Sequence, residues 1–141
     1  MNNMTLLSVD YGDKRTGIAC CNNDGLLCFP VTVINDGYDK RVIEKVTEIA
    51  REKGAKKIVV GLPKNMDGTL GFRAEACREF AEKLGDYSGI ETVLFDERLT
   101  TVMAHRALNV TDTRGKKRKA VVDALSAVMI LEDYIKSQKN K

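Results

Sequence analysis

A short apolar run that ends in an acidic residue constrains the fold of this 141-residue chain more than any other feature. Residues 6–9 are apolar apart from Ser8, and Asp10 follows them directly, ahead of turn residues. A short apolar run closed by a turn is typical of a buried strand. A second apolar run, residues 16–21, follows so closely that it must turn back as an antiparallel partner. The sequence therefore predicts a hairpin with a carboxylate at the tip of a central strand.

Asp10 admits two interpretations. In the first, Asp10 and Gly12 only shape the turn, which is the commoner role of an isolated Asp-x-Gly. In the second, the carboxylate lies in partly dry surroundings, where a cation or hydrogen-bond donors must compensate its charge. The rest of the chain bears on this choice.

Downstream patterns predict the other elements. Pro30 places the third expected strand, residues 26–34, at a sheet edge or a bulge. Helical spacing begins at Asp39 and ends at Gly54, and it begins again at Phe72 and ends at Gly85. The remaining expected elements are strands at residues 56–61 and 90–95, a helix beginning near Thr100 or Thr101, a polar loop at 109–119 and a buried helix at 120–136.

The expected order is β-β-β-α-β-α-β-α-α, which predicts an α/β fold with a mixed five-stranded sheet covered by helices. Right-handed crossovers would join its parallel strands. Ligands in such sheets collect beyond the carboxyl ends of the parallel strands. Those ends carry Asp10, Gly61 and the pair Asp96 and Glu97, and we expect all of them at one cleft.

The last helix carries a further acid. Its apolar residues surround nearly the whole helix, which indicates burial, and Asp123 shares a face with Ala127 and Ile130. A position near the helix amino terminus explains a lone Asp through the helix dipole. Together with Asp10 and Glu97, however, it makes three acids that are attached to apolar elements.

Three carboxylates in one small cleft repel one another and stay ionised only if a hard dication bridges them. Mg²⁺ or Mn²⁺ prefers such oxygen ligands. Two such ions about 4 Å apart stabilise the attacking and leaving oxygens of a phosphoryl transfer. The pattern therefore favours metal-assisted hydrolysis of phosphodiesters.

Composition excludes several other classes. With 43% hydrophobic and 30% charged residues the chain is typical of one soluble domain, which we expect to span residues 1–141. It has neither an apolar stretch of about 20 residues nor a signal peptide, so we expect a cytoplasmic protein with no membrane partner. Its four cysteines lack Cys-x-x-Cys spacing and are expected in the core. The single His105 excludes zinc sites that need several histidines.

One basic run dominates the net charge of +3. Residues 114–119 hold five of the 23 basic residues, and the other 18 are slightly outnumbered by 20 acidic ones. Such a run is usually a solvated loop, but a protein that binds polyanions also displays one. It can hold a phosphate backbone beside the acids.

Four segments together resemble the YqgF (RuvX) family, which is described as candidate Holliday junction resolvases with a ribonuclease-H-like fold. They are residues 9–19 (VDYGDKRTGIA), 60–69 (VGLPKNMDGT), 96–101 (DERLTT) and 123–127 (DALSA), in order over essentially the whole chain. Four ordered motifs are specific where one would be weak. Ser126 is a conservative departure, since the commoner form has Ala there.

The resemblance implies that Asp10, Glu97 and Asp123 are catalytic acids that bind Mg²⁺ or Mn²⁺, with two ions expected. It also links the chain to maturing the 5′ end of small-subunit ribosomal RNA from its precursor. Asp96 and Glu97 point to opposite sides of an extended segment, and the family's pattern, not periodicity, selects Glu97. The expected nucleic-acid-binding residues are Lys14, Arg15, Lys64, Asn65, Arg98, Arg114, Lys116, Lys117, Arg118 and Lys119, whereas Asp67-Gly68 is expected to form a tight turn.

Alternatives remain open. The substrate can be precursor ribosomal RNA or a four-way DNA junction, which requires two cuts and hence a homodimer, whereas a monomer suffices for a single RNA site. A nucleic-acid-binding module without catalysis is a third possibility. Asp10, Gly12 and Gly17 also resemble the phosphate-binding hairpin of the actin-like ATPases, although 141 residues supply only one of their two lobes.

Overall fold

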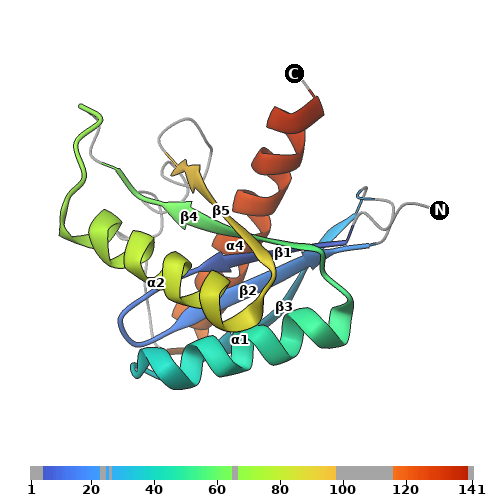
Figure 1. Cartoon of the computed structure of the whole chain (residues 1–141), viewed down its shortest axis with the longest axis horizontal. Helices are drawn as coiled ribbons and strands as arrows, with labels where there is room; N and C mark the ends of the chain where they lie inside the picture. The colour runs from blue at the N-terminus through green and yellow to red at the C-terminus, as the bar shows by residue number, and fades with distance from the viewer. Residues whose placement is uncertain (1–4, 23–24, 26, 65–66, 98–115, 140–141) are drawn as a thin grey trace.

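The computed structural model describes residues 5–22, 25, 27–64, 67–97 and 116–139, with the side chains of residues 116–123 excepted (Figure 1). Its elements are, in chain order, β1 (Leu6–Asp10), β2 (Thr16–Cys21), β3 (Cys28–Ile34), α1 (Asp39–Lys53), β4 (Lys57–Leu62), α2 (Phe72–Ser88), β5 (Glu91–Asp96) and α4 (Lys116–Lys139). The helix expected near Thr100 or Thr101 and the single histidine, His105, lie outside the described residues.

The five strands form one mixed sheet in the order β3-β2-β1-β4-β5. β1 pairs antiparallel with β2, and β2 pairs antiparallel with β3. On the other side β1 pairs parallel with β4, and β4 pairs parallel with β5. The predicted mixed five-stranded sheet is therefore confirmed. β3 is an edge strand, and its pairing with β2 shifts register between Ile18 and Ala19, beside Pro30, as that proline predicts.

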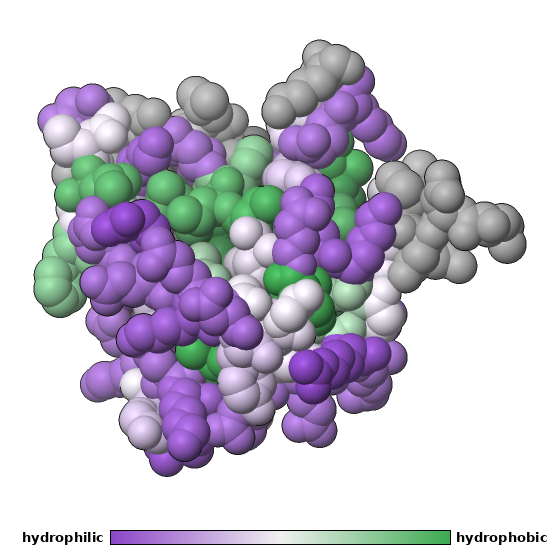
Figure 2. Space-filling view, in the orientation of Figure 1, coloured by the Kyte–Doolittle hydropathy of each residue, from purple (hydrophilic) through white to green (hydrophobic). Residues whose placement is uncertain are grey.

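Helices cover both faces of the sheet, with α1 and α2 on one face and α4 on the other (Figure 1). The α1/α2 face is built from large apolar residues, among them Leu7, Val9, Ile18 and Val60, which pack with Phe80 of α2. The outer surface over α1 is mainly hydrophilic (Figure 2), so its apolar residues are turned towards the sheet.

The α4 face carries a small polar residue in the central strand β1. Ser8 lies on this face and donates a hydrogen bond of 2.6 Å from its Oγ to the carbonyl oxygen of Ala127 in α4. Successive side chains of a strand point to opposite faces, so Asp10, two residues after Ser8, projects to the α4 side as well. The close approach of α4 therefore places a helix beside the acid at the tip of β1.

Three predicted helix boundaries are wrong. α2 continues through Gly85 to Ser88 and ends at Gly89, whose φ of 70° is left-handed. A glycine inside a helix costs about 1 kcal/mol and does not stop it, and at Gly85 an added Cβ would lie 3.5 Å from Thr92 Oγ1 of β5. α4 begins at Lys116 rather than at residue 120, because lysine and arginine are good helix formers. The expected loop thus ends earlier, and α4 also ends three residues later than expected, at Lys139, whereas the other boundaries agree within two residues.

The described part of the chain contains no helix that is long and apolar enough to cross a membrane. Its four cysteines are free thiols, and three of them, Cys20, Cys21 and Cys77, are buried as expected for small core residues, whereas Cys28 is half-buried. Burial raises the pKa of the Cys28 thiol to about 12, so it stays protonated at neutral pH.

Candidate active site

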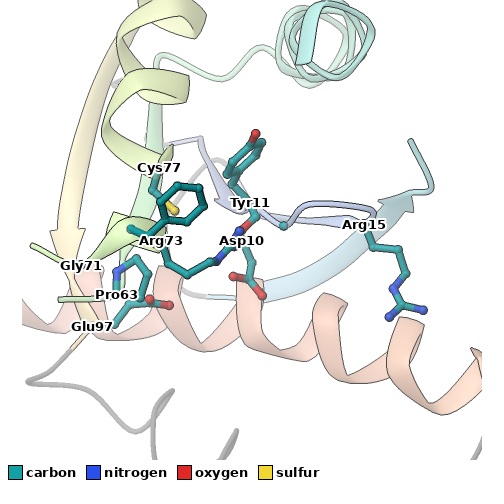
Figure 3. Close-up of a pocket in the computed structure, with 11 residues that line it drawn as sticks. Asp10, Tyr11, Arg15, Pro63, Gly71, Arg73, Cys77 and Glu97 are labelled. Atoms are coloured by element: carbon teal, nitrogen blue, oxygen red, sulfur yellow. The ribbon is translucent and has the colours of Figure 1, made fainter. Parts of the chain in front are cut away.

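A cavity of about 510 Å³ opens where the carboxyl ends of β1 and β4 meet the start of α2 (Figure 3). Parallel strands deliver their carboxyl ends to the same edge of a sheet, which is why segments far apart in sequence meet here. The lining residues are Asp10, Tyr11, Gly12, Arg15, Gly61, Pro63, Gly71, Phe72, Arg73, Cys77 and Glu97. The structure thus brings Asp10, Gly61 and Glu97 together at one cleft, as expected.

Two carboxylates from different strands face this cavity on the α4 side (Figure 3). Asp10 ends β1 and is half-buried, whereas Glu97 directly follows β5 and is only 1% exposed. An ionised carboxylate removed from water is costly unless cations or hydrogen-bond donors compensate it. A buried acid beside a second one is therefore typical of a site that carries chemistry rather than of a core position.

Gly61, at the end of β4, provides the space that the Glu97 carboxylate occupies. A Cβ added to Gly61 would lie 2.9 Å from Glu97 Oε1 and 2.7 Å from Ile130 Cδ1 of α4. Both distances are too short for a carbon to be accommodated without movement of Glu97 or Ile130. A residue without a side chain at this position thus lets Glu97 pack between β4 and α4.

Asp96 and Glu97 have different surroundings. Glu97 lines the cavity, and Asp96, the last residue of β5, is half-buried and is not among the lining residues. Phe95 packs on the α4 side, where its ring lies edge-on to that of Tyr134 at 5.7 Å. Strand alternation therefore turns Asp96 to the opposite side, and Glu97 is the member of the pair that faces Asp10.

Arg73 fixes one wall of the cavity to the turn after β1. Its guanidinium donates hydrogen bonds to the carbonyl oxygen of Tyr11 at 2.7 Å and to Asp13 Oδ1 at 2.6 Å. The Tyr11 ring stacks on Phe80 with centroids 4.2 Å apart, and its hydroxyl donates to Asp39 Oδ1. These contacts join β1, α1 and α2 just behind Asp10.

Burial and the hydrogen bond to Asp39 raise the pKa of Tyr11 well above its usual range. Its hydroxyl is therefore protonated at neutral pH and acts as a donor to Asp39. We assign Tyr11 a structural part in holding the turn, with no proton transfer of its own.

The expected nucleic-acid-binding residues fall into three groups: one that lines the cavity, others that lie outside it, and those outside the described part of the chain. Arg15 lines the cavity, whereas Lys14 is exposed and Lys64 is half-buried, and neither of these is among the lining residues. Asn65, Arg98 and Arg114 lie outside the described residues. The backbones of Lys116, Lys117, Arg118 and Lys119 form the first turns of α4, and their side chains are likewise outside the described part, as is that of Asp123.

The turn expected at Asp67-Gly68 is present. Asp67 Oδ1 accepts hydrogen bonds from the backbone nitrogen of Thr69 at 3.0 Å and from its hydroxyl at 2.6 Å, and Gly68 has a φ of 92°. Its carboxylate is thus engaged in local turn geometry.

Sequence reasoning missed two cavity residues at the start of α2. Helical spacing places Phe72 among the apolar helix residues, whereas its side chain is 88% exposed, and that spacing does not distinguish Arg73. A signal was available, because both residues directly follow the turn-rich loop that leaves the carboxyl end of β4. Side chains that begin a helix at this sheet edge are placed at the cleft.

The fold is that of the RuvC-like resolvases, a ribonuclease-H-like class. Thermus thermophilus RuvC, solved with a Holliday junction substrate, superposes with a TM-score of 0.60 at 11% identity over 98% of this chain and 97% of that one. The fowlpox virus Holliday junction resolvase gives 0.53 at 14% identity, with 95% and 99% covered.

At the level of sequence, residues 4–137 match the model of the RuvX family, which is described as Holliday junction resolvase. A Thermoanaerobacter pseudethanolicus protein is 42% identical over 139 residues, which cover 98% of this chain and 100% of that protein. A Bacillus cytotoxicus protein is 40% identical over 137 residues, 96% and 100% of the two chains. Both relatives are named as candidate pre-16S rRNA nucleases. The chain belongs to the RuvX family, as its motifs indicate.

Proposed function

We propose that this protein is a nuclease that hydrolyses phosphodiester bonds in structured nucleic acid, with precursor small-subunit ribosomal RNA as its substrate and maturation of the 5′ end as its role. The observation that carries the proposal is the pairing of Asp10 and Glu97, from separate strand ends, on one cavity. The names of the relatives supply the substrate, since both refer to pre-16S rRNA.

A divalent cation fits the donor set of this cavity. Asp10 and Glu97 offer carboxylate oxygens, and the described residues of the cavity include no histidine that would favour zinc. We propose that Asp10, Glu97 and Asp123 hold Mg²⁺ or Mn²⁺ and that two ions bind. When bound, such ions generate a nucleophilic hydroxide and stabilise the charge that develops on the leaving oxygen.

The chain's own residues would orient the substrate. Arg15 lines the cavity together with the two acids, and we propose that its guanidinium contacts a phosphate oxygen of the bound strand. Glu97, enclosed between Gly61 and Ile130, keeps its carboxylate in one position. A fixed carboxylate reduces the reorganisation needed during the reaction. Lys14 and Lys64 remain proposed phosphate contacts outside the cavity.

A four-way DNA junction is the second candidate substrate, because the family model carries the description Holliday junction resolvase. Resolving a junction requires two cuts, so this candidate calls for a homodimer, whereas a monomer suffices for one cut in RNA. Binding without cleavage is the third candidate. The cytoplasmic location expected from the sequence stays a prediction.

One experiment separates these candidates. Purified protein is incubated with a precursor-rRNA fragment and, in parallel, with a four-way DNA junction, in Mg²⁺, in Mn²⁺ and in EDTA. We expect metal-dependent cleavage of the RNA and none in EDTA. Cleavage of the junction alone, by a dimer, would favour the second candidate. Tight binding of both substrates without any cut would overturn the nuclease proposal.

The inactive variant for this assay is Asp10→Asn, with Asp86→Asn as the matched control. Asp86 is an exposed acid in α2, so its variant should cleave like the wild type. Asp10→Asn should abolish cleavage while melting at the same or a higher temperature, since removing one of several repelling carboxylates relieves strain in the metal-free protein. Wild-type cleavage by Asp10→Asn would remove Asp10 from the site.

A further inference from the structure

Phe72 is the most exposed large apolar side chain in the described part of the chain, at 88%. A single exposed apolar residue needs no explanation on a protein surface. Phe72 differs because it lines the same cavity as Asp10, Glu97 and Arg15. An aromatic ring open to solvent beside two carboxylates and a guanidinium is suited to a ligand that is flat, apolar on its faces and anionic elsewhere.

The backbone that carries Phe72 is held in place on both sides. Its neighbour Arg73 donates the two hydrogen bonds to the turn after β1, and the Glu75 amide donates to the Gly71 carbonyl at 3.1 Å. One turn further along α2, Ala74 and Cys77 are buried against Leu62. The ring thus extends from a rigid support, which lowers the entropy that a bound partner must overcome.

We propose that Phe72 is a stacking platform for an unpaired base of the substrate, so that the strand at the cavity is single-stranded. The inference rests on the proposed nuclease function and adds to it the local structure of the substrate. Aromatic side chains stack on bases of any sequence, and unpaired bases of RNA loops, bulges and ends can be splayed out to make such stacks. A base inside a duplex has both faces covered by its neighbours and cannot use the ring.

A cavity of about 510 Å³ is of the size that encloses a compact organic ligand. Its lining supplies one feature for each part of a nucleotide, with Phe72 for the base and Arg15 for a phosphate. A protein partner would need a broader apolar surface than one ring beside charged groups.

The test is a binding titration in EDTA, where cleavage does not occur. Fluorescence anisotropy would give the affinity for a short single-stranded RNA, for a duplex of the same length, and for single strands with one abasic position moved along the sequence. Phe72→Ala should weaken single-strand binding by about 5- to 150-fold, the value of one base stacked on an aromatic ring. Duplex affinity should not change, and one abasic position should remove the difference between wild type and variant.

One rescue variant and two controls complete the design. Phe72→Trp should retain the wild-type affinity, whereas Phe72→Leu, apolar without a π-face, should behave like the alanine variant. Tyr87→Ala removes another exposed aromatic residue of α2, in its last turn, and should change nothing. Because Phe72 is exposed, none of these variants should lower the melting temperature, which circular dichroism checks.

Equal single-strand affinity in the wild type and Phe72→Ala overturns the inference, as does an equal loss on duplex and single strand or an equal loss in Tyr87→Ala. These results would leave cleavage by the wild type untouched, so the proposed nuclease function would survive them. Conversely, a wild type that never cleaves but loses base-dependent binding with Phe72→Ala would overturn the nuclease proposal and keep the stacking platform.

Discussion

The two faces of the sheet differ in what their side chains do. The α1/α2 face carries Leu7, Val9 and Ile18 into a large cluster with both helices, and all three are fully buried. The α4 face carries two small residues, Ser8 in β1 and Gly61 near the end of β4, beside a smaller apolar cluster that includes Val59. The first face supplies most of the apolar burial, and the second leaves room for a carboxylate between strand and helix. Because successive side chains of a strand point to opposite faces, residues that build the main core alternate with residues that face the candidate acids.

The largest expected effect tests this separation at the end of β5. Glu97→Gln should lower the cleavage rate more than about 100-fold, because losing even a partner that only supports a metal ligand costs about 10–100-fold, whereas Asp96→Asn should stay within a few-fold of the wild type. The reason is that Glu97 lines the cavity on the α4 side and Asp96 does not. Single-turnover kinetics with the RNA fragment would measure both. The reverse ranking would show that Asp96 is the functional acid.

The basic residues that begin α4 should provide the next largest effect. The triple variant of Lys116, Lys117 and Arg118 to Ala should weaken binding to every sequence alike and reduce the slope of log affinity against log salt by about two to three units. The run contains no aromatic residue, so it can neutralise phosphates but cannot stack on bases. Duplex and branched substrates would be titrated over several salt concentrations.

The opposite end of the same helix offers the control. Lys136 and Lys139 are exposed in the last turn of α4, and replacing both with Ala should leave the slope nearly unchanged. If the triple variant also keeps the wild-type slope, the run is a solvated segment, and Lys14, Arg15 and Lys64 are the next residues to test.

Two adjacent residues of β4, Gly61 and Val60, test the difference between the two faces of the sheet within one strand. Gly61→Ala adds a carbon on the α4 side, 2.9 Å from Glu97 Oε1, and should cost about 1–3 kcal/mol of stability from overpacking together with at least a tenfold loss of activity as Glu97 is displaced. Val60→Ala removes atoms from the fully buried opposite face. It should cost a similar 1–3 kcal/mol and leave the activity of the folded protein unchanged.

Urea denaturation and cleavage assays on the same preparations would separate the two effects. Equal loss of activity in the two variants, relative to the folded fraction, would mean that the faces do not divide stability from chemistry. A fully active Gly61→Ala would show that Glu97 tolerates displacement.

The sheet, its edge and an acid at the ends of β1 and β5 were predictable from the sequence because the signals are local, whereas the choice of Glu97 over Asp96 depended on the resemblance to the RuvX family. Asp10 and Glu97 each follow a short apolar run, and parallel pairing brings the ends of such runs together. The exposure of Phe72 was not predictable, since an aromatic residue at helical spacing is usually buried. Neither was the contact of Arg73 with Tyr11, which joins residues 62 positions apart. Gly85 does not stop α2, because the left-handed cap lies at the next glycine, Gly89, and one glycine inside a helix costs only about 1 kcal/mol.

The smallest expected effect concerns Tyr11, which supports the site from the structural face. Tyr11→Phe removes the hydrogen bond to Asp39 and keeps the stack on Phe80 and the backbone carbonyl that Arg73 contacts. A part-buried hydrogen bond to a charged group contributes about 1.5–3 kcal/mol, so we expect a loss near the lower value with activity unchanged. Tyr38→Phe, at an exposed tyrosine, should leave stability as it is.

The pH dependence of this loss has a definite sign. Burial, and then Asp39, raise the pKa of folded Tyr11 above that of an unfolded tyrosine, which is about 10. Above that pH the unfolded chain releases the Tyr11 proton while the folded chain retains it, so the ionisation of Tyr11 lowers wild-type stability as the pH rises. The advantage of wild type over Tyr11→Phe should therefore be complete below about pH 10 and shrink above it, as urea denaturation at neutral and alkaline pH would measure. A constant difference across that range would mean that Tyr11 ionises alike in both states, and that its bond to Asp39 does not hold the turn behind Asp10.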